Sequence, residues 1–121
     1  MAKAVRLGVV GGHRGKGFGY SLASLKGKMK LTAMCDLCEG VCAAWKKDFP
    51  SIQTFTDYET MLDSGVVDAV LIATPMPLHV PQSIAALKRG IHVASEVTAC
   101  LTISDGRKLI RAVEESSAVY F

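Results

Sequence analysis

Residues 7–20, with the sequence LGVVGGHRGKGFGY, decide the fold that this chain is predicted to adopt. The apolar residues 5–10 indicate a buried strand, and the apolar stretch 18–25 favours a helix. Five glycines follow the strand within nine residues: Gly11, Gly12, Gly15, Gly17 and Gly19. A strand, a glycine-rich turn and a helix N-terminus form a site for phosphate, because free backbone N–H groups and the helix dipole favour negative charge.

The glycine spacing leaves two interpretations open. Gly15 and Gly17 have the first spacing of G-x-G-x-x-G, but Tyr20 stands where the third glycine is expected. The stretch is either a dinucleotide-binding loop or a plain glycine-rich turn between a strand and a helix. In the first interpretation His13 and Arg14 also lie in the loop, where His13 can meet phosphate.

Composition and charge exclude several classes of protein. The 121 residues suit one domain, and half of them are hydrophobic. A net charge of +3, with scattered basic residues, is too weak to indicate a nucleic-acid partner. No apolar run approaches the roughly 20 residues of a membrane span, and the run after Arg6 is too short for a signal peptide. Four cysteines fit a reducing compartment, so a cytoplasmic location is expected.

Predicted strands and helices alternate along the whole chain. After the first strand and helix, the pattern predicts strands at 29–36, 52–55, 66–73, 91–95 and 118–121, and helices at 38–48, 57–64, 80–89 and 104–116. Strands joined by helical crossovers imply a parallel α/β sheet with helices on both faces. The glycine turn after the first strand favours the doubly wound, Rossmann-like form, with strand order 3-2-1-4-5-6.

Asp36 is the candidate ribose ligand. It is predicted to end the second strand, 25 residues after Gly11. A carboxylate there accepts hydrogen bonds from the adenosine ribose hydroxyls and repels a 2′-phosphate. Leu37 and Cys38 follow, so no adjacent arginine is placed to bind that phosphate, which favours NAD over NADP. The alternative is that Asp36 caps the helix that starts at Cys38, and both roles are compatible.

The ends of the fourth and fifth strands carry further candidates. Ligands of open α/β sheets bind beyond the carboxyl ends of strands, so Ala73, Thr74, Pro75 and the loop to His79 should line a cofactor cleft. His79 either lies near the nicotinamide, where it can titrate near neutrality, or belongs to the first turn of the next helix. Glu96 ends the fifth strand, where its charge should be paired or reach the cleft; the alternative is a helix N-cap or loop role.

The cysteines do not indicate a metal site. Cys35, Cys38 and Cys42 form C-x2-C-x3-C, but Cys35 is predicted on a strand and no fourth ligand is nearby. Cys38 and Cys42 are one helical turn apart, which is typical of a packed helix face. Trp45, on the same helix, is predicted to be core, and His92 is predicted to be structural.

Taken together, these segments resemble the N-terminal domain of the glucose–fructose oxidoreductase / inositol dehydrogenase (Gfo/Idh/MocA) family. The resemblance rests on RLGVVGGHRGKG, LTAMCD, FTDYETMLDSGVVDAVLIATP followed by His79, and AALKRGIHVASE. It implies an NAD-binding domain of an oxidoreductase acting on a sugar, polyol or related carbohydrate. The implied cofactor-binding residues are Gly11, Gly12, His13, Arg14, Gly15, Gly17, Asp36, Ala73, Thr74, Pro75, His79 and Glu96, with His79 and Glu96 nearest the nicotinamide.

Two departures from the family pattern leave other functions open. The family's E-K-P is Glu96-Val97-Thr98 here, so the lysine near the nicotinamide is absent, and Met76 replaces the usual asparagine. Val97 can neither donate a proton nor polarise a hydroxyl. Relatives that use NAD transiently to cleave glycosides can also lack this lysine. The alternatives are therefore an NAD-dependent glycosidase domain and a dinucleotide-binding module without catalysis.

The length of the chain is the remaining departure. Family members carry a second, larger domain that completes the carbohydrate site, so residues 1–121 are expected to be a fragment that turns over no sugar alone. Segment 118–121 is expected to form an exposed edge strand through which two copies associate. The alternative is a monomer whose last residues fray.

Overall fold

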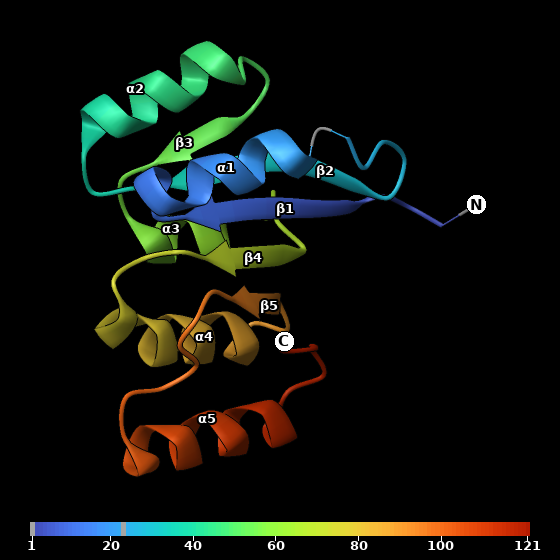
Figure 1. The fold of residues 1–121 in the computed structure, drawn as a ribbon. Coiled ribbons are helices and arrows are strands. Elements are labelled where there is room, and N and C mark those ends of the chain that lie inside the picture. The colour runs from blue at the N-terminus through green and yellow to red at the C-terminus, as the bar shows by residue number, and fades with distance from the viewer. Residues whose placement is uncertain (1, 23) are drawn as a thin grey trace.

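The computed structural model describes residues 2–22 and 24–121, in which five parallel strands form one sheet with helices on both faces (Figure 1). The sheet order is β3-β2-β1-β4-β5, as predicted for these strands. The elements are β1 (Val5–Val10), α1 (Gly12–Leu22), β2 (Met29–Cys35), α2 (Glu39–Asp48), β3 (Gln53–Phe55), α3 (Tyr58–Asp63), β4 (Ala69–Ile72), the 3-10 helix η1 (Met76–Leu78), α4 (His79–Lys88), β5 (His92–Ser95) and α5 (Ile103–Glu115). No described helix has the length and apolar character that crossing a bilayer requires.

The core has two layers, one on each face of the sheet. Because side chains alternate along a strand, Leu7 and Val9 of β1 point to one face and Val10 to the other. The Val9 layer lies under α1 and α2 and contains Trp45, which is fully buried as predicted. The Val10 layer lies under α3, α4 and α5. The unbroken apolar run of β4 follows from burial on both faces.

Helix α1 begins at Gly12, whereas the sequence indicated a helix only from Phe18. Gly11 alone forms the turn, with a φ of +91° that a side chain would strain. A Cβ on Gly12 would lie 2.3 Å from Val41 Cγ1, and one on Gly15 would lie 2.3 Å from Val9 Cγ1. These glycines are therefore helical, and they let α1 pack against the sheet and α2.

The predicted sixth strand is reduced to a single isolated bridge. Tyr120 bridges Val93 of β5 in parallel, and the Phe121 amide donates to the Val93 carbonyl at 2.9 Å. His92 is structural, as predicted: its Nδ1 accepts a hydrogen bond from the Val119 amide at 2.9 Å. Segment 118–121 thus occupies the place of a sixth strand beside β5, but one bridged residue is too little to count as a strand.

Segment 118–121 lies at the edge of the sheet, beside β5, and exposes apolar side chains. Val119 and Phe121 are 59% and 73% exposed, and they border an apolar groove of about 580 Å³ over β1, β4 and β5. Because unpaired edges and apolar faces favour association, we expect residues 1–121 to self-associate in light scattering, and Val119→Lys to shift the distribution toward monomer. A monomer at high micromolar concentration, or an oligomer that Val119→Lys leaves unchanged, contradicts this prediction.

The start of β1 is tied to the start of β4 by an ion pair. Asp68 accepts hydrogen bonds from the Arg6 side chain at 3.0 and 2.7 Å and from the Arg6 amide at 2.9 Å. These bonds lower the pKa of Asp68 to about 2. A carboxyl group whose pKa falls on folding stabilises the fold above its unfolded pKa, near 3.9, and this contribution is lost as the pH falls toward 2.

We therefore expect the stability difference between the protein and its Asp68→Asn variant to shrink between pH 5 and pH 2. The pair is partly exposed, so the difference at pH 5 should be about a fivefold or smaller change in the unfolding equilibrium constant. Urea unfolding at both pH values measures it. Because other carboxylates titrate equally in both proteins, a difference that stays constant contradicts the assignment.

Candidate functional site

A cleft of about 640 Å³ lies at the carboxyl ends of the strands. Its walls come from the segments that follow β1, β2, β4 and β5. These four strands lie side by side in one sheet (Figure 1). The cleft lies where the strand order reverses, between β1 and β4, which is where ligands bind in open α/β sheets. The lining residues are Gly11, His13, Arg14, Asp36, Ala73, Thr74, Pro75, Met76, Pro77, Glu96 and Val97.

Most of the predicted site residues line this cleft. They are Gly11, His13, Arg14, Asp36, Ala73, Thr74, Pro75 and Glu96. Gly12, Gly15, Gly17 and His79 are not among the lining residues. Gly12 and Gly15 are buried against the core, and nothing lies within 4 Å of a Cβ placed on the exposed Gly17. Gly12 and Gly15 therefore serve packing rather than lining the cleft, and Gly17 does neither.

Asp36 lies between the start of α1 and the start of α2. One carboxylate oxygen accepts a hydrogen bond from the Gly12 amide at 2.8 Å, and the other accepts from the Cys38 amide at 2.9 Å. The N-cap of α2 is Cys38, so the alternative prediction that Asp36 caps this helix is wrong in position. Asp36 instead accepts from the amide of the cap residue. A carboxylate accepts about four hydrogen bonds. Asp36 therefore keeps acceptor positions for a ligand's hydroxyls.

The first turn of α1 supplies positive potential to the same cleft. Backbone amides in the first turn of a helix have no carbonyl partner within the helix, and the helix dipole places positive charge there. The Gly12 amide is taken by Asp36, while the next two residues, His13 and Arg14, both line the cleft. This end of the cleft is suited to an anionic group such as a phosphate.

Arg14 and Glu96 form an ion pair across the cleft. Arg14 Nε donates to Glu96 Oε2 at 2.9 Å, and Nη2 donates to Oε1 at 2.8 Å. These bonds hold the pKa of Glu96 below its usual value. The sequence predicted that a charge at this position is paired or reaches the cleft, and Glu96 does both.

His79 is buried behind the cleft wall, at the start of α4, which agrees with the helix alternative. Its Nε2 lies 2.7 Å from the Thr74 carbonyl oxygen and its Nδ1 lies 2.8 Å from the Thr98 carbonyl oxygen. A neutral imidazole carries one N–H and can donate to only one of them at a time. The ring thus links the two segments that form this wall and does not itself reach the cavity.

Gln82 is a supporting residue that the sequence did not reveal. Its side-chain oxygen accepts a hydrogen bond from Thr74 Oγ1 at 2.6 Å, and its backbone carbonyl oxygen accepts one from Tyr58 Oη at 2.9 Å. Burial raises the pKa of the Tyr58 hydroxyl, so this group stays a donor. No local pattern signals these contacts, because they join three separate elements.

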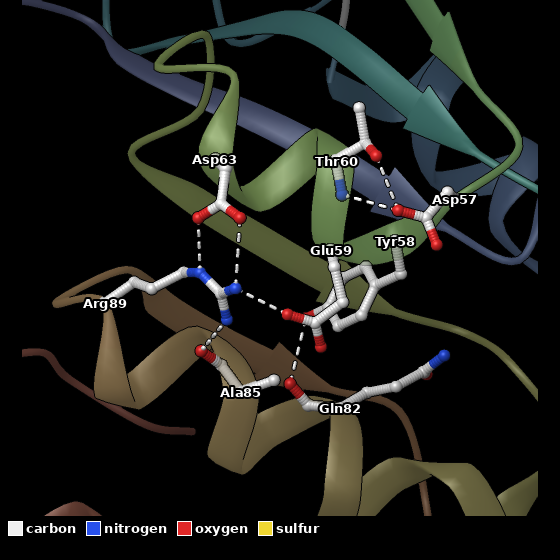
Figure 2. A network of polar contacts seen from close by, with 8 residues as sticks. All are labelled: Asp57, Tyr58, Glu59, Thr60, Asp63, Gln82, Ala85 and Arg89. Carbon is white, nitrogen blue, oxygen red and sulfur yellow. Dashed lines mark hydrogen bonds and ion pairs between the residues drawn. The ribbon is translucent and has the colours of Figure 1, made fainter.

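Figure 2 shows how α4, which carries Gln82, is held against α3. Arg89 Nε donates to Asp63 at 2.7 Å, and Nη2 donates to Glu59 at 2.5 Å. Asp57 caps α3 by accepting a hydrogen bond from the Thr60 amide at 2.8 Å. These contacts fix the helix from which Gln82 supports the Thr74 side of the cleft.

Apolar side chains occupy the positions where the resemblance places an asparagine and a lysine. Met76 and Val97 both line the cleft and are 49% and 76% exposed. Neither side chain can exchange a proton at neutral pH. Within the described residues, no group of three or more His, Cys, Asp or Glu side chains is arranged to hold a metal ion. At these two positions the cleft offers apolar contact to a ligand.

The sheet order, the turn at Gly11 and the acid after β2 define a doubly wound domain of the dinucleotide-binding type. The model of the family described as "Oxidoreductase family, NAD-binding Rossmann fold" matches residues 5–121. The chain belongs to this family, Gfo/Idh/MocA.

Relatives in the family differ in activity. A glycosyl hydrolase family 109 protein of Solibacter usitatus is 32% identical over 91% of this chain, and inositol 2-dehydrogenase of Corynebacterium glutamicum is 33% identical over 79%. WlbA dehydrogenase of Bordetella pertussis, solved with NADH and UDP-GlcNAcA, superposes with a TM-score of 0.92 at 28% identity over 98% of this chain. The chain spans 28%, 29% and 36% of the length of these three proteins.

Proposed function

We propose that this domain binds NAD(H) and forms the cofactor-binding part of an oxidoreductase that acts on a sugar, polyol or related carbohydrate. The observation that carries the proposal is the placement of Asp36. Its carboxylate lies beside the first turn of α1 and lines the cleft, with acceptor positions left for ribose hydroxyls. Solved relatives that carry NADH or NAD(H), at 28% and 26% identity, support the same assignment.

The cleft residues fit the parts of a dinucleotide. The first-turn amides of α1 suit the pyrophosphate. Glycine at position 11 lets the turn pack against the end of β4, because a Cβ there would lie 2.6 Å from the Ala73 carbonyl oxygen. Asp36 suits the adenosine ribose and disfavours a 2′-phosphate. Met76 and Val97 offer apolar contact to the nicotinamide end.

Calorimetric titration of residues 1–121 with NAD+ and with NADP+ tests this proposal. We expect NAD+ to bind at least tenfold more tightly, which corresponds to about 1.4 kcal/mol. Equal or tighter binding of NADP+ contradicts the assignment of Asp36. No binding of either cofactor contradicts the proposed function itself.

A glycosidase that uses NAD transiently is the second candidate. It is favoured by Val97 in place of the lysine and by the family 109 relatives, among them an alpha-N-acetylgalactosaminidase of Tannerella forsythia that is 30% identical over 74% of this chain. In either reaction, the chemistry that bound NAD supplies is acceptance of a hydride from the sugar, which a glycosidase returns within the same cycle. This chain's residues bind and orient the cofactor in both cases.

A protein that continues beyond Phe121 into a substrate domain separates the two candidates. An oxidoreductase accumulates NADH in proportion to the polyol or sugar consumed. A glycosidase releases p-nitrophenol from p-nitrophenyl α-N-acetylgalactosaminide without net NADH. Whichever signal appears identifies the candidate that holds, and the other is then excluded for the substrates tested.

Residues 1–121 alone are expected to turn over no sugar. Hydride transfer from an alcohol needs a base and a substrate held against the nicotinamide, and Val97 supplies neither. Absorbance at 340 nm with NAD+ and myo-inositol should therefore stay flat even where NAD+ binds. A substrate-dependent rise with the purified domain contradicts this expectation.

A further inference from the structure

The ion pair between Arg14 and Glu96 lies where a dinucleotide's phosphates are expected. Arg14 is the third residue of α1, whose first turn is the anion site, and it is the only Arg or Lys among the described residues that line the cleft. Arg14 donates two hydrogen bonds in the cleft, and Glu96 accepts both. The cation best placed to meet a phosphate is therefore already neutralised by the protein.

The two partners differ in their freedom to move. The Arg14 side chain is 67% exposed, whereas that of Glu96 is 18% exposed. Exposed ion pairs are weak, so an arginine of this kind can leave its partner at small cost. Glu96 is held by the chain, since its amide donates to the Ile72 carbonyl of β4 at 2.9 Å. If the pair opens, the guanidinium moves and the carboxylate stays.

We propose that Glu96 competes with the cofactor's pyrophosphate for Arg14, and that Arg14 transfers from Glu96 to the phosphates when a dinucleotide binds. This inference rests on the proposed function, because it places a dinucleotide in this cleft. Glu96 thereby weakens the binding of phosphate-bearing ligands. In the unbound cleft, Glu96 neutralises the charge of Arg14. After the transfer, Glu96 is a free carboxylate beside Val97.

Calorimetric titration of Arg14→Gln, Glu96→Gln and the double variant with NAD+ and with adenosine tests the transfer. Glu96→Gln should raise the affinity for NAD+ by about two- to fivefold, because Glu96 no longer competes with the phosphates for Arg14. Arg14→Gln should lower the affinity for NAD+ by about tenfold or more, because a charge-assisted hydrogen bond to phosphate is lost. The double variant should match Arg14→Gln, and adenosine affinity should not change.

Two controls separate the transfer from a structural effect. Arg14→Lys keeps the charge and should restore most of the NAD+ affinity. Lys16→Gln removes a cation from the same helix, but Lys16 pairs with Asp48 at 2.8 Å outside the cleft, so NAD+ affinity should be unaffected.

The outcomes distinguish this inference from the proposed function. If the unsubstituted domain does not bind NAD+, both are overturned. If it binds NAD+ and Glu96→Gln leaves the affinity unchanged or weaker, the transfer is overturned and the proposed function stands. An equal loss of adenosine and NAD+ affinity in Arg14→Gln, or a loss in Lys16→Gln as large as in Arg14→Gln, also overturns the transfer.

Discussion

Gly15→Ala is expected to lower the free energy of unfolding by about 1–3 kcal/mol, the usual cost of forcing an extra methyl group into a packed core. A Cβ at this position would lie 2.3 Å from Cγ1 of Val9, which is fully buried in the middle of β1. Neither the strand nor α1 can move away without disturbing the layer that contains Trp45. Urea unfolding measures the change.

Gly17→Ala is the matched control, two residues further along the same helix. Nothing lies within 4 Å of a Cβ at Gly17. Alanine is the better helix former, so this variant should gain about 0.5–1 kcal/mol. Both substitutions change helix propensity in the same way, so the difference between their free energies of unfolding reports the cost of packing the extra methyl group at Gly15. A Gly15→Ala protein as stable as Gly17→Ala contradicts the packing role of the α1 glycines.

Asp36→Asn is expected to narrow the preference for NAD+ over NADP+ by about tenfold, or 1.4 kcal/mol. The substitution keeps the size of the side chain and an oxygen that can accept from the Gly12 amide, but it removes the charge that repels a 2′-phosphate. The affinity for NADP+ should therefore rise by a larger factor than the affinity for NAD+ falls. Paired titrations of both cofactors measure the change.

Asp57→Asn serves as the control for Asp36→Asn. Asp57 also accepts a hydrogen bond at a helix start, but it caps α3 and is not among the residues that line the cleft. Its substitution should leave the cofactor preference unchanged. A preference that shifts equally in both variants, or in neither, contradicts the assignment of the ribose to Asp36.

The strand order and the position of the cleft could be predicted because they follow from local patterns. The apolar run that became β4 signals a strand buried on both faces, and the acid that follows the second strand marks a strand end. Carboxyl ends of parallel strands meet at one edge of the sheet. Asp36, Thr74 and Glu96 were therefore predicted to meet, and all three line the cleft.

The start of α1 could not be predicted from propensity, because glycine is a poor helix former. Contacts with Val9 and Trp45, which come from other elements, override that preference. The spacing of Gly12, Gly15 and Gly19, at i, i+3 and i+7, places all three on one helix face, and it is the signal that would have revealed the helix.

The sequence did not reveal which residues pair across separate elements. Arg14 and Glu96 are 82 residues apart, and Thr74 meets Gln82 only because the chain turns between β4 and α4. His79 was predicted either at the nicotinamide or in a helix turn, and only its burial between two carbonyl oxygens places it behind the wall. Such partners depend on tertiary structure, which local patterns do not encode.

The most direct measurement of the central claim is amide chemical-shift mapping of the ¹⁵N-labelled domain during titration with NAD+. We predict saturable shifts at the cleft, led by the amides of Gly12, His13, Asp36 and Thr74, with little change along the apolar groove over β1, β4 and β5. Shifts confined to that groove, or no shifts at millimolar NAD+, would contradict the assignment of the cleft as a dinucleotide site.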